Sequence, residues 1–264
     1  MEQPKLTLRQ AVVLGLVHGP AELLPISSSG HTALVPWLRG WAYEELEPAA
    51  RKRFEVALHA GTVLGLLFVM RGEVALAGLG GRRLAMIALA TAPAAVAGLA
   101  LERPIERRLG RPASIAAGLL TGSLAMAVAE HFGGKERLAR DATPGDGLFL
   151  GAAQALALIP GVSRSGAVRA AARARGFARA DAERLAFEIG LPVTIGALAL
   201  KARELRRSER DEWQALAAGA CASCASTLAS GALLRRSGSL VPYAAYRTAV
   251  AGAVLRRLRQ NARG

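Results

Sequence analysis

The chain has 264 residues, of which 52% are apolar, 5% aromatic and 20% charged, and its formal net charge is +14. This apolar share and the presence of only two cysteines exclude an intrinsically disordered chain, a collagen-like chain and a disulfide scaffold. A nucleic-acid-binding domain is also excluded, because the basic residues stand in short clusters at the ends of apolar segments and not beside stacking aromatic residues.

The N-terminal segment resembles a signal peptide at first sight. Lys5 and Arg9 precede an apolar run over residues 11–17, which is the order of a signal peptide's basic and apolar regions. The run is short, however, and His18 and Glu22 interrupt the apolar sequence that follows. We interpret this segment as a helix that stays part of the protein.

Long stretches without charge follow one another along the rest of the chain, with arginine clusters such as Arg82–Arg83 between them. Several approach the ~20 residues that a helix needs to cross a bilayer. Cys221 and Cys224 lie within one of them, where they are expected to pack as small apolar side chains. The sequence therefore predicts an all-α polytopic membrane protein, with helices over residues 56–70, 84–101, 113–129, 189–200, 213–234 and, interrupted by Arg247, 240–255.

Two segments, residues 14–37 and 148–167, do not follow the pattern of a simple span. Each has an apolar helical stretch, a proline that disfavours further helix, a turn rich in serine and glycine, and a resumed helix. Non-helical backbone at membrane depth is tolerated only where protein buries it or where it lines a wet cavity. We therefore expect two re-entrant helix pairs.

These two segments also resemble each other. An offset of about half the chain aligns Ser27–Gly30 with Ser163–Gly166, Gly15 with Gly151, and His18 with Gln154. Half-chain repeats with broken helices are typical of membrane proteins whose site lies where the repeats meet. We predict one membrane domain over residues 1–264, with repeats over approximately 6–130 and 143–258.

Ionisable side chains inside apolar segments are costly and are functional candidates by default. His18 and Glu22 share one helical face, and Ser28 and His31 follow in the first turn and the helix after it. If the two turns meet, Arg164 joins them from the second repeat. A carboxylate, a hydroxyl, an imidazole and a guanidinium in one cavity suit phosphoryl chemistry.

Each group has a predicted role. Ser28 can act as a nucleophile that Glu22 or His31 activates, Arg164 can bind phosphate oxygens, and Glu22 can hold a divalent cation such as Mg²⁺ or Ca²⁺. The turns offer backbone N–H groups for binding phosphate, from Ser27, Ser29, Gly30, Ser163, Ser165 and Gly166. Ser27 and Ser29 could instead only cap the next helix.

Other polar residues receive structural interpretations. We expect His59 to make a structural hydrogen bond and His131 to lie at a helix end at the membrane interface. Glu55 and Glu188 begin apolar runs and are expected to form salt bridges there.

The two turns carry a resemblance to a known family. The stretch E-L-L-P-I-S-S-S-G-H over residues 22–31 and the stretch I-P-G-V-S-R-S-G-A over residues 159–167 resemble the two signatures of the bacitracin-resistance-type undecaprenyl-diphosphate phosphatases. The segments 54–67 and 187–197 also resemble this family. The likeness therefore covers most of the chain, with the right order and spacing.

The resemblance implies an integral membrane hydrolase with two re-entrant helix pairs in interleaved inverted repeats. It implies hydrolysis of undecaprenyl diphosphate to the monophosphate, which recycles the lipid carrier for peptidoglycan synthesis and confers bacitracin resistance. The family's functional positions match Glu22, Ser28, His31 and Arg164, and its activity is supported by divalent cations. The expected location is the cytoplasmic membrane of a bacterium. The expected partners are a polyprenyl diphosphate and the bilayer, with no nucleic acid and with a homodimer left open.

One departure concerns the metal. The family usually has a second acidic residue four positions before Glu22, where this sequence has His18. We therefore expect His18 to modulate the site. An alternative function also stays open, since inverted repeats with broken helices suit a lipid flippase that binds a polyprenyl phosphate without cleaving it.

Overall fold

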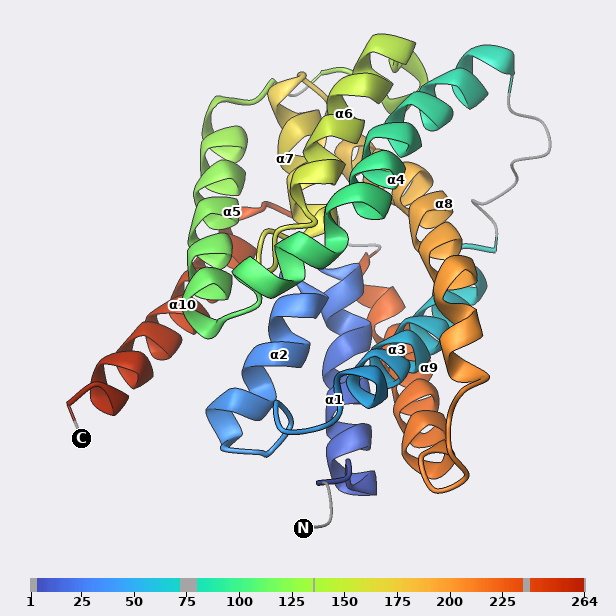
Figure 1. Cartoon of the computed structure of the whole chain (residues 1–264). Coiled ribbons are helices and arrows are strands. Elements are labelled where there is room, and N and C mark those ends of the chain that lie inside the picture. The colour runs from blue at the N-terminus through green and yellow to red at the C-terminus, as the bar shows by residue number, and fades with distance from the viewer. Residues whose placement is uncertain (1–3, 72–79, 135, 235–237, 264) are drawn as a thin grey trace. The chain divides into compact units, whose positions relative to one another are not determined.

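The computed structural model describes residues 4–71, 80–134, 136–234 and 238–263 (Figure 1). These residues form helices and no β-strand, apart from one isolated bridge between Arg137 and Phe177. The predicted all-α class is thereby confirmed. The elements are α1 (Leu8–Leu23), α2 (Ser28–Arg39), α3 (Pro48–Val69), α4 (Gly81–Leu109), α5 (Pro112–Phe132), the short 3-10 turn η1 (Ala139–Asp141), α6 (Pro144–Leu156), α7 (Arg164–Ala174), α8 (Arg179–Leu205), α9 (Trp213–Leu234) and α10 (Val241–Asn261).

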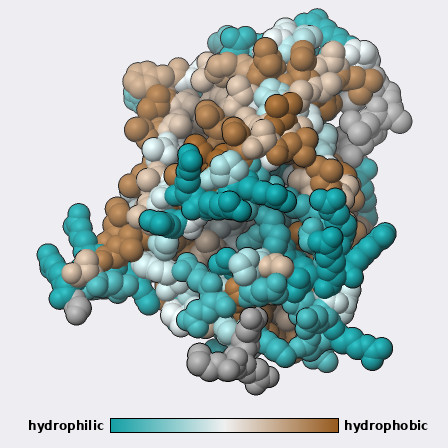
Figure 2. Space-filling view, in the orientation of Figure 1, coloured by the Kyte–Doolittle hydropathy of each residue, from teal (hydrophilic) through white to brown (hydrophobic). Residues whose placement is uncertain are grey.

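Most of the predicted helices extend beyond the apolar runs into the flanking charged residues, whereas α9 has the predicted bounds. Among the described residues, α4, α5 and α8 are long and apolar enough to cross a membrane. Large apolar side chains point outward from two of them, including Val96 and Leu99 on α4 and Leu124 on α5, each more than 60% exposed. Figure 2 shows apolar surface over the region of α4 to α6. Such a surface is suited to lipid and not to water, so the prediction of a multi-pass membrane protein is confirmed.

The chain divides into two compact units. Unit 1 comprises Met1–Leu23, His31–Val74 and Thr194–Arg235, and unit 2 comprises Leu24–Gly30, Ala75–Val193 and Arg236–Gly264. The helices α2 and α8 each begin in unit 2 and continue in unit 1.

Unit 1 is built around α9, against which α1 and α3 both pack (Figure 1). Gly15 on α1 lies against the carbonyl of Gly219, and Gly61 on α3 lies against that of Ala220, so closely that a Cβ at either glycine would overlap the α9 backbone. Small residues allow membrane helices this kind of approach. The apolar core of the unit lies toward one end of these helices and includes Leu14, Phe54, Leu58 and Leu216.

In unit 2, α6 packs on α4, and α5 packs on α7 and α10. Gly147 and Gly151 on α6 lie against the α4 carbonyls of Met86 and Ala90. Gly151, which aligns with Gly15 in the sequence, thus has the same packing role in the second repeat. In each case the first helix of one half-chain packs on the fourth helix of the other, which is the pairing that interleaved repeats produce. The repeat boundaries, the inversion and the re-entrant course stay predictions.

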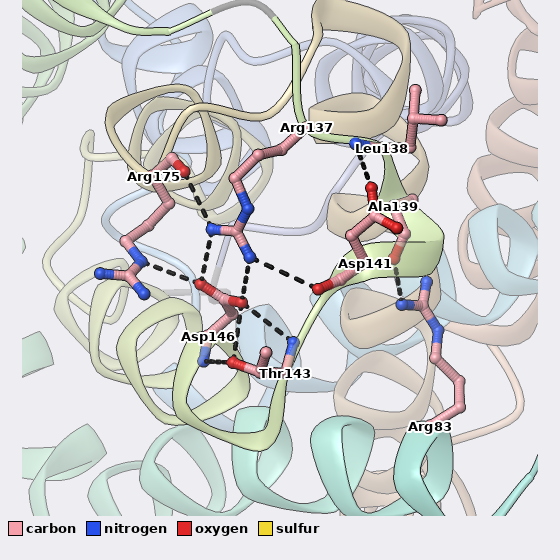
Figure 3. A network of polar contacts seen from close by, with 8 residues as sticks. All are labelled: Arg83, Arg137, Leu138, Ala139, Asp141, Thr143, Asp146 and Arg175. Carbon is pink, nitrogen blue, oxygen red and sulfur yellow. Dashed lines mark hydrogen bonds and ion pairs between the residues drawn. The ribbon is translucent and has the colours of Figure 1, made fainter.

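A polar network fixes the start of α6 (Figure 3). The carboxylate of Asp146, which is fully buried, accepts hydrogen bonds from Arg137 Nη2 at 2.7 Å and from Arg175 Nε at 2.9 Å. Thr143 caps α6, since its Oγ1 accepts from the Asp146 backbone N–H at 3.2 Å while the carboxylate accepts from the Thr143 N–H at 2.9 Å. Because Arg175 stands at the end of α7, the network ties the two ends of the helix pair α6–α7 together.

Several polar residues outside the two turns form ion pairs or lie at a helix end. Glu188 forms ion pairs with Arg83 and Arg184, and Glu55 lies 3.7 Å from Lys52, so both expected salt bridges are confirmed. Cys221 and Cys224 are free thiols, but Cys221 is exposed and only Cys224 is half-buried, so the expected packing of both side chains is wrong for Cys221. His131 lies in the last turn of α5, as expected for a helix end.

Candidate functional site

The first break in the helices follows the sequence pattern. Helix α1 ends at Leu23, two residues before Pro25, and α2 begins at Ser28. Between them Ser27 has a φ of +79°, and its Oγ accepts a hydrogen bond from the Gly30 N–H at 3.3 Å. Ser27 therefore caps α2 from a left-handed backbone conformation that is uncommon for a residue with a side chain.

The second break has the same geometry. Helix α6 ends at Leu156, and Ser163 precedes α7 with a φ of +74°. The Ser163 Oγ accepts from the Gly166 N–H at 3.2 Å, as Ser27 does in the first turn. Ser27 and Ser163 are the only described non-glycine residues with positive φ. The alignment of the two turns in the sequence thus corresponds to a shared backbone conformation.

The structure brings both turns together inside unit 2. Ser165 Oγ donates to the carbonyl of Leu24, where the first turn begins, at 3.3 Å, and it lies 3.4 Å from Ser163 Oγ. Each turn leads into the N-terminus of a helix, α2 or α7, whose backbone N–H groups and dipole favour an anion. Unit 2 therefore places two helix N-termini at neighbouring turns.

Arg247 on α10 connects the two turns. Its side chain is completely buried, and Nη1 donates to the carbonyl of Pro25 at 3.0 Å while Nη2 donates to that of Gly161 at 2.8 Å. Nη2 also lies 3.2 Å from the carbonyl of Leu119 on α5. A planar guanidinium can donate hydrogen bonds to several acceptors at once, whereas the ammonium group of a lysine lacks this forked arrangement of donors. Arg247 thus holds the two turns in a fixed register.

Arg164 is the first residue of α7 and is partly buried. Its guanidinium lies against Gly190 on α8, close enough that a Cβ at position 190 would overlap Nη1. Gly190 therefore provides the space that Arg164 occupies. Binding of phosphate oxygens by this guanidinium stays a prediction.

Unit 1 contains the acidic and imidazole groups. His18 is buried, with Nδ1 2.9 Å from Thr62 Oγ1 and 3.4 Å from Ser223 Oγ, and these two hydroxyls are 2.6 Å apart. The ring of His59 meets that of His18 edge to face, with centroids 4.6 Å apart. Ligand atoms of His18, Glu22 and His59 all lie within 4.8 Å of one another, the only such group of potential metal ligands among the described residues.

The predicted site residues fall into two groups. Unit 2 contains Arg164 and the turn residues Ser27, Ser28, Ser29, Gly30, Ser163, Ser165 and Gly166, whereas unit 1 contains His18, Glu22 and His31. His31 is buried on α2, three residues after Ser28. Convergence of Glu22 with Arg164 on one substrate stays a prediction.

Sequence reasoning missed three residues of this region. The proximity of His59 to Glu22 is visible in no local pattern, so the sequence suggested only a structural hydrogen bond for His59. The role of Gly190 also depends on a long-range contact. Arg247 did carry a signal, because it is a charge within an apolar run, and such a charge is costly unless it has partners.

Comparison with known proteins identifies the family. The model of the family described as "Bacitracin resistance protein BacA" matches residues 11–253, which is most of the chain. The chain belongs to this family. The resemblance drawn from the two turns is thereby confirmed.

Relatives in the family share substantial sequence identity. A protein of Geobacter sulfurreducens is 41% identical over 94% of this chain and 97% of its own length, and one of Geobacter metallireducens is 38% identical over 93% and 96%. A protein of Trichlorobacter lovleyi is 41% identical over 75% of this chain and 76% of its own length. All three are named undecaprenyl-diphosphatase.

Proposed function

We propose that this protein is an integral membrane phosphatase that hydrolyses undecaprenyl diphosphate to undecaprenyl phosphate and inorganic phosphate. The observation that carries the proposal is the pair of serine-capped turns, joined by Arg247 and carrying Arg164, in a membrane protein of this family. The named relatives give the substrate. Release of the monophosphate returns the lipid carrier to peptidoglycan synthesis, and removal of the diphosphate fits bacitracin resistance.

The donors fit a diphosphate head group. Phosphate oxygens accept hydrogen bonds from the Arg164 guanidinium and from backbone N–H groups at the starts of α2 and α7. These groups are preorganised, because the turns are capped by Ser27 and Ser163 and held by Arg247. Charge that develops on the phosphoryl oxygens in the transition state meets donors that need little rearrangement.

The hydrolytic step has a nucleophile and a base. The Ser28 hydroxyl attacks the terminal phosphorus, an Oγ–P bond forms, the bridging P–O bond breaks, and undecaprenyl phosphate leaves. Water then cleaves the phosphoserine, which releases phosphate and restores the hydroxyl. We propose that His31 is the base that accepts the proton of the Ser28 hydroxyl, because it lies on the same face of α2 one turn later.

A divalent cation is part of the proposal. Glu22 is the carboxylate that would hold it, with His18 and His59 as neighbouring donors. Such an ion neutralises charge on a diphosphate and polarises its oxygens. The donor set fits a cation in chemical terms, since two imidazoles and one carboxylate are common metal ligands.

The test is phosphate release from a C55 or shorter polyprenyl diphosphate by the purified protein in detergent, with and without chelator. We expect phosphate release, and a lower rate of release when chelator is present. If the Ser28 hydroxyl is the nucleophile, Ser28→Ala should lower the rate by about 10² or more. Ser239→Ala, which changes a serine outside both turns, is the matched control. Near-normal turnover by Ser28→Ala would assign the attack to water. Absence of release from any prenyl diphosphate, with metal supplied, would favour the flippase.

The apolar helices and the bacterial relatives support a location in a bacterial membrane. We propose the cytoplasmic membrane of a bacterium, because the substrate carrier is used there for cell-wall synthesis. Membrane fractionation checks this location. Light scattering of the detergent-solubilised protein tests the homodimer, which stays open.

A further inference from the structure

Three side chains of unit 1 form a cluster whose chemistry differs from that of an all-oxygen metal site. His18 and Glu22 are one turn apart on α1, and His59 comes from α3. One ligand atom of each lies within 4.8 Å of the others. A tetrahedral metal with ligands at about 2.0–2.2 Å separates them by roughly 3.5 Å, so small side-chain rotations close the cluster on an ion.

The orientation of His18 suits a metal ligand. Its Nδ1 is 2.9 Å from Thr62 Oγ1, and Thr62 is in turn 2.6 Å from Ser223 Oγ. Metal-binding histidines commonly use one ring nitrogen in a hydrogen bond that sets the tautomer and the ring orientation, and the other nitrogen binds the ion. Here Nδ1 makes that contact, so Nε2 is the nitrogen that would bind the ion, and Ser223 on α9 also lies 3.4 Å from Nδ1.

The donor set decides the class of metal. Mg²⁺ and Ca²⁺ are hard ions that prefer oxygen ligands, and this cluster offers a single carboxylate. Two imidazoles and one carboxylate instead suit first-row transition metals such as Zn²⁺, Fe²⁺ and Co²⁺. Three protein ligands also leave a coordination position for a phosphate oxygen or water.

We propose that His18, Glu22 and His59 form a binding site for a first-row transition-metal ion, in preference to Mg²⁺ or Ca²⁺. The inference deepens the proposed function and rests on it for the role of the ion in phosphate release. Binding of the ion is independent of that function and can be measured without substrate.

The test uses the full-length protein, purified in detergent and stripped of metal. We expect one Co²⁺ per chain in equilibrium dialysis with elemental analysis, together with a visible absorption band of the bound ion. Zn²⁺ should displace the Co²⁺, and a large excess of Mg²⁺ should not. His59→Ala and Glu22→Gln should each weaken Co²⁺ binding at least tenfold.

His131→Ala is the matched control, because it removes an imidazole from a helix end outside the cluster. It should bind Co²⁺ like the unchanged protein. His18→Gln adds a third test. Because His18 is buried, thermal unfolding first checks that this variant folds. If it does not fold, the His59 and Glu22 variants decide whether the metal site exists.

Equal competition by Mg²⁺, or Co²⁺ binding that survives both His59→Ala and Glu22→Gln, would overturn the proposal. Failure of the site and failure of the function are distinguishable. Phosphate release without Co²⁺ or Zn²⁺ binding contradicts the metal site alone, whereas stoichiometric binding without phosphate release contradicts the proposed function alone.

Discussion

The two broken helix pairs share a turn but differ in what surrounds the helix before it. At position 18 of the first pair, an imidazole contacts the hydroxyls of Thr62 and Ser223. At the aligned position of the second pair, Gln154 donates to the backbone carbonyl of Ala90 at 3.1 Å. The first helix thus carries groups that can move protons or bind metal, and the second carries a group that only fixes packing.

The start of each pair shows the same division. Helix α6 begins in the charged network of Asp146, Arg137 and Arg175 (Figure 3), whereas no acidic residue lies in the first turn of α1. We therefore propose separate roles for the two turns: the first supplies reactive groups, and the second supplies Arg164 and a rigid support. The following predictions test this division, from the largest expected effect on turnover to the smallest.

The largest effect is expected from Arg164→Lys. The variant keeps the charge of the second turn and loses the bidentate fork for phosphate oxygens, so turnover should fall by about 10² or more. Phosphate release measures this. Arg175→Lys, at the other end of α7, is the control and should change turnover less than about threefold. If Arg164→Lys also changes turnover less than about threefold, Arg164 contributes only its positive charge.

The second-largest effect on turnover is expected from Arg247→Met. The change leaves the carbonyls of Pro25 and Gly161 without the donor that joins the turns, which costs about 1–3 kcal/mol for each buried group left unsatisfied. We expect a lower unfolding temperature and a loss of turnover of about tenfold or more, as the turns lose their register. Unchanged turnover in a variant with a lower unfolding temperature would show that Arg247 contributes stability alone.

Gly190→Ala should lower turnover by about tenfold with little change in stability. The added methyl group overlaps Arg164 Nη1, but a flexible arginine end can move away at small cost. The functional loss would then come from the displaced guanidinium. Parallel measurements of turnover and unfolding temperature check this, with Gly196→Ala as control, because a Cβ there meets nothing within 4 Å.

Asp146→Asn should change turnover least and act on stability. Burial raises the pKa of the Asp146 carboxyl, but hydrogen bonds from Arg137, from the Thr143 backbone and from Arg175 outweigh this and hold the pKa well below its usual range. The variant should lose about 1–3 kcal/mol, less than a fully buried pair because both arginines are partly exposed.

The pH dependence of this contribution has a defined sign. Since the folded-state pKa is lowered, the stabilisation is complete above the unfolded-state value of about 4 and decreases as the pH falls toward the folded-state value. The unfolding temperature of the unchanged protein should therefore drop more steeply below about pH 4 than that of Asp146→Asn. Parallel curves would show that the network adds no pH-dependent stability.

Local patterns predicted much of this fold. Pro25 and Pro160 indicated where the helices break, and the charge-free runs indicated the cores of six helices. The similarity of the two turns predicted a common conformation, which Ser27 and Ser163 share. These features could be read from the sequence because proline, glycine and serine act on the backbone within a few residues.

The remaining features depend on contacts between distant parts of the chain. Thr62 and Ser223 meet His18 only because α1 and α3 both pack on α9. The pairing of Asp146 with Arg175 likewise requires α6 to return against α7. Arg247 could have been recognised by the rule that selected His18 and Glu22, since it too is a charge within an apolar run, but its acceptors are backbone carbonyls that no side-chain pattern reveals.

The packing of α1 on α9 has a consequence for biosynthesis. At a synthesis rate of about 5–20 residues per second, α9 leaves the ribosome roughly ten seconds or more after α1. Until then Gly15 and Gly61 lack the α9 backbone on which they pack, and His18 lacks the Ser223 hydroxyl. The helices α4 and α6, by contrast, are close in the sequence and can pair while the chain is still growing. The nascent protein therefore contains its first helix long before that helix can dock on α9, and until then α3, with Thr62 and His59, is the helix that can contact His18.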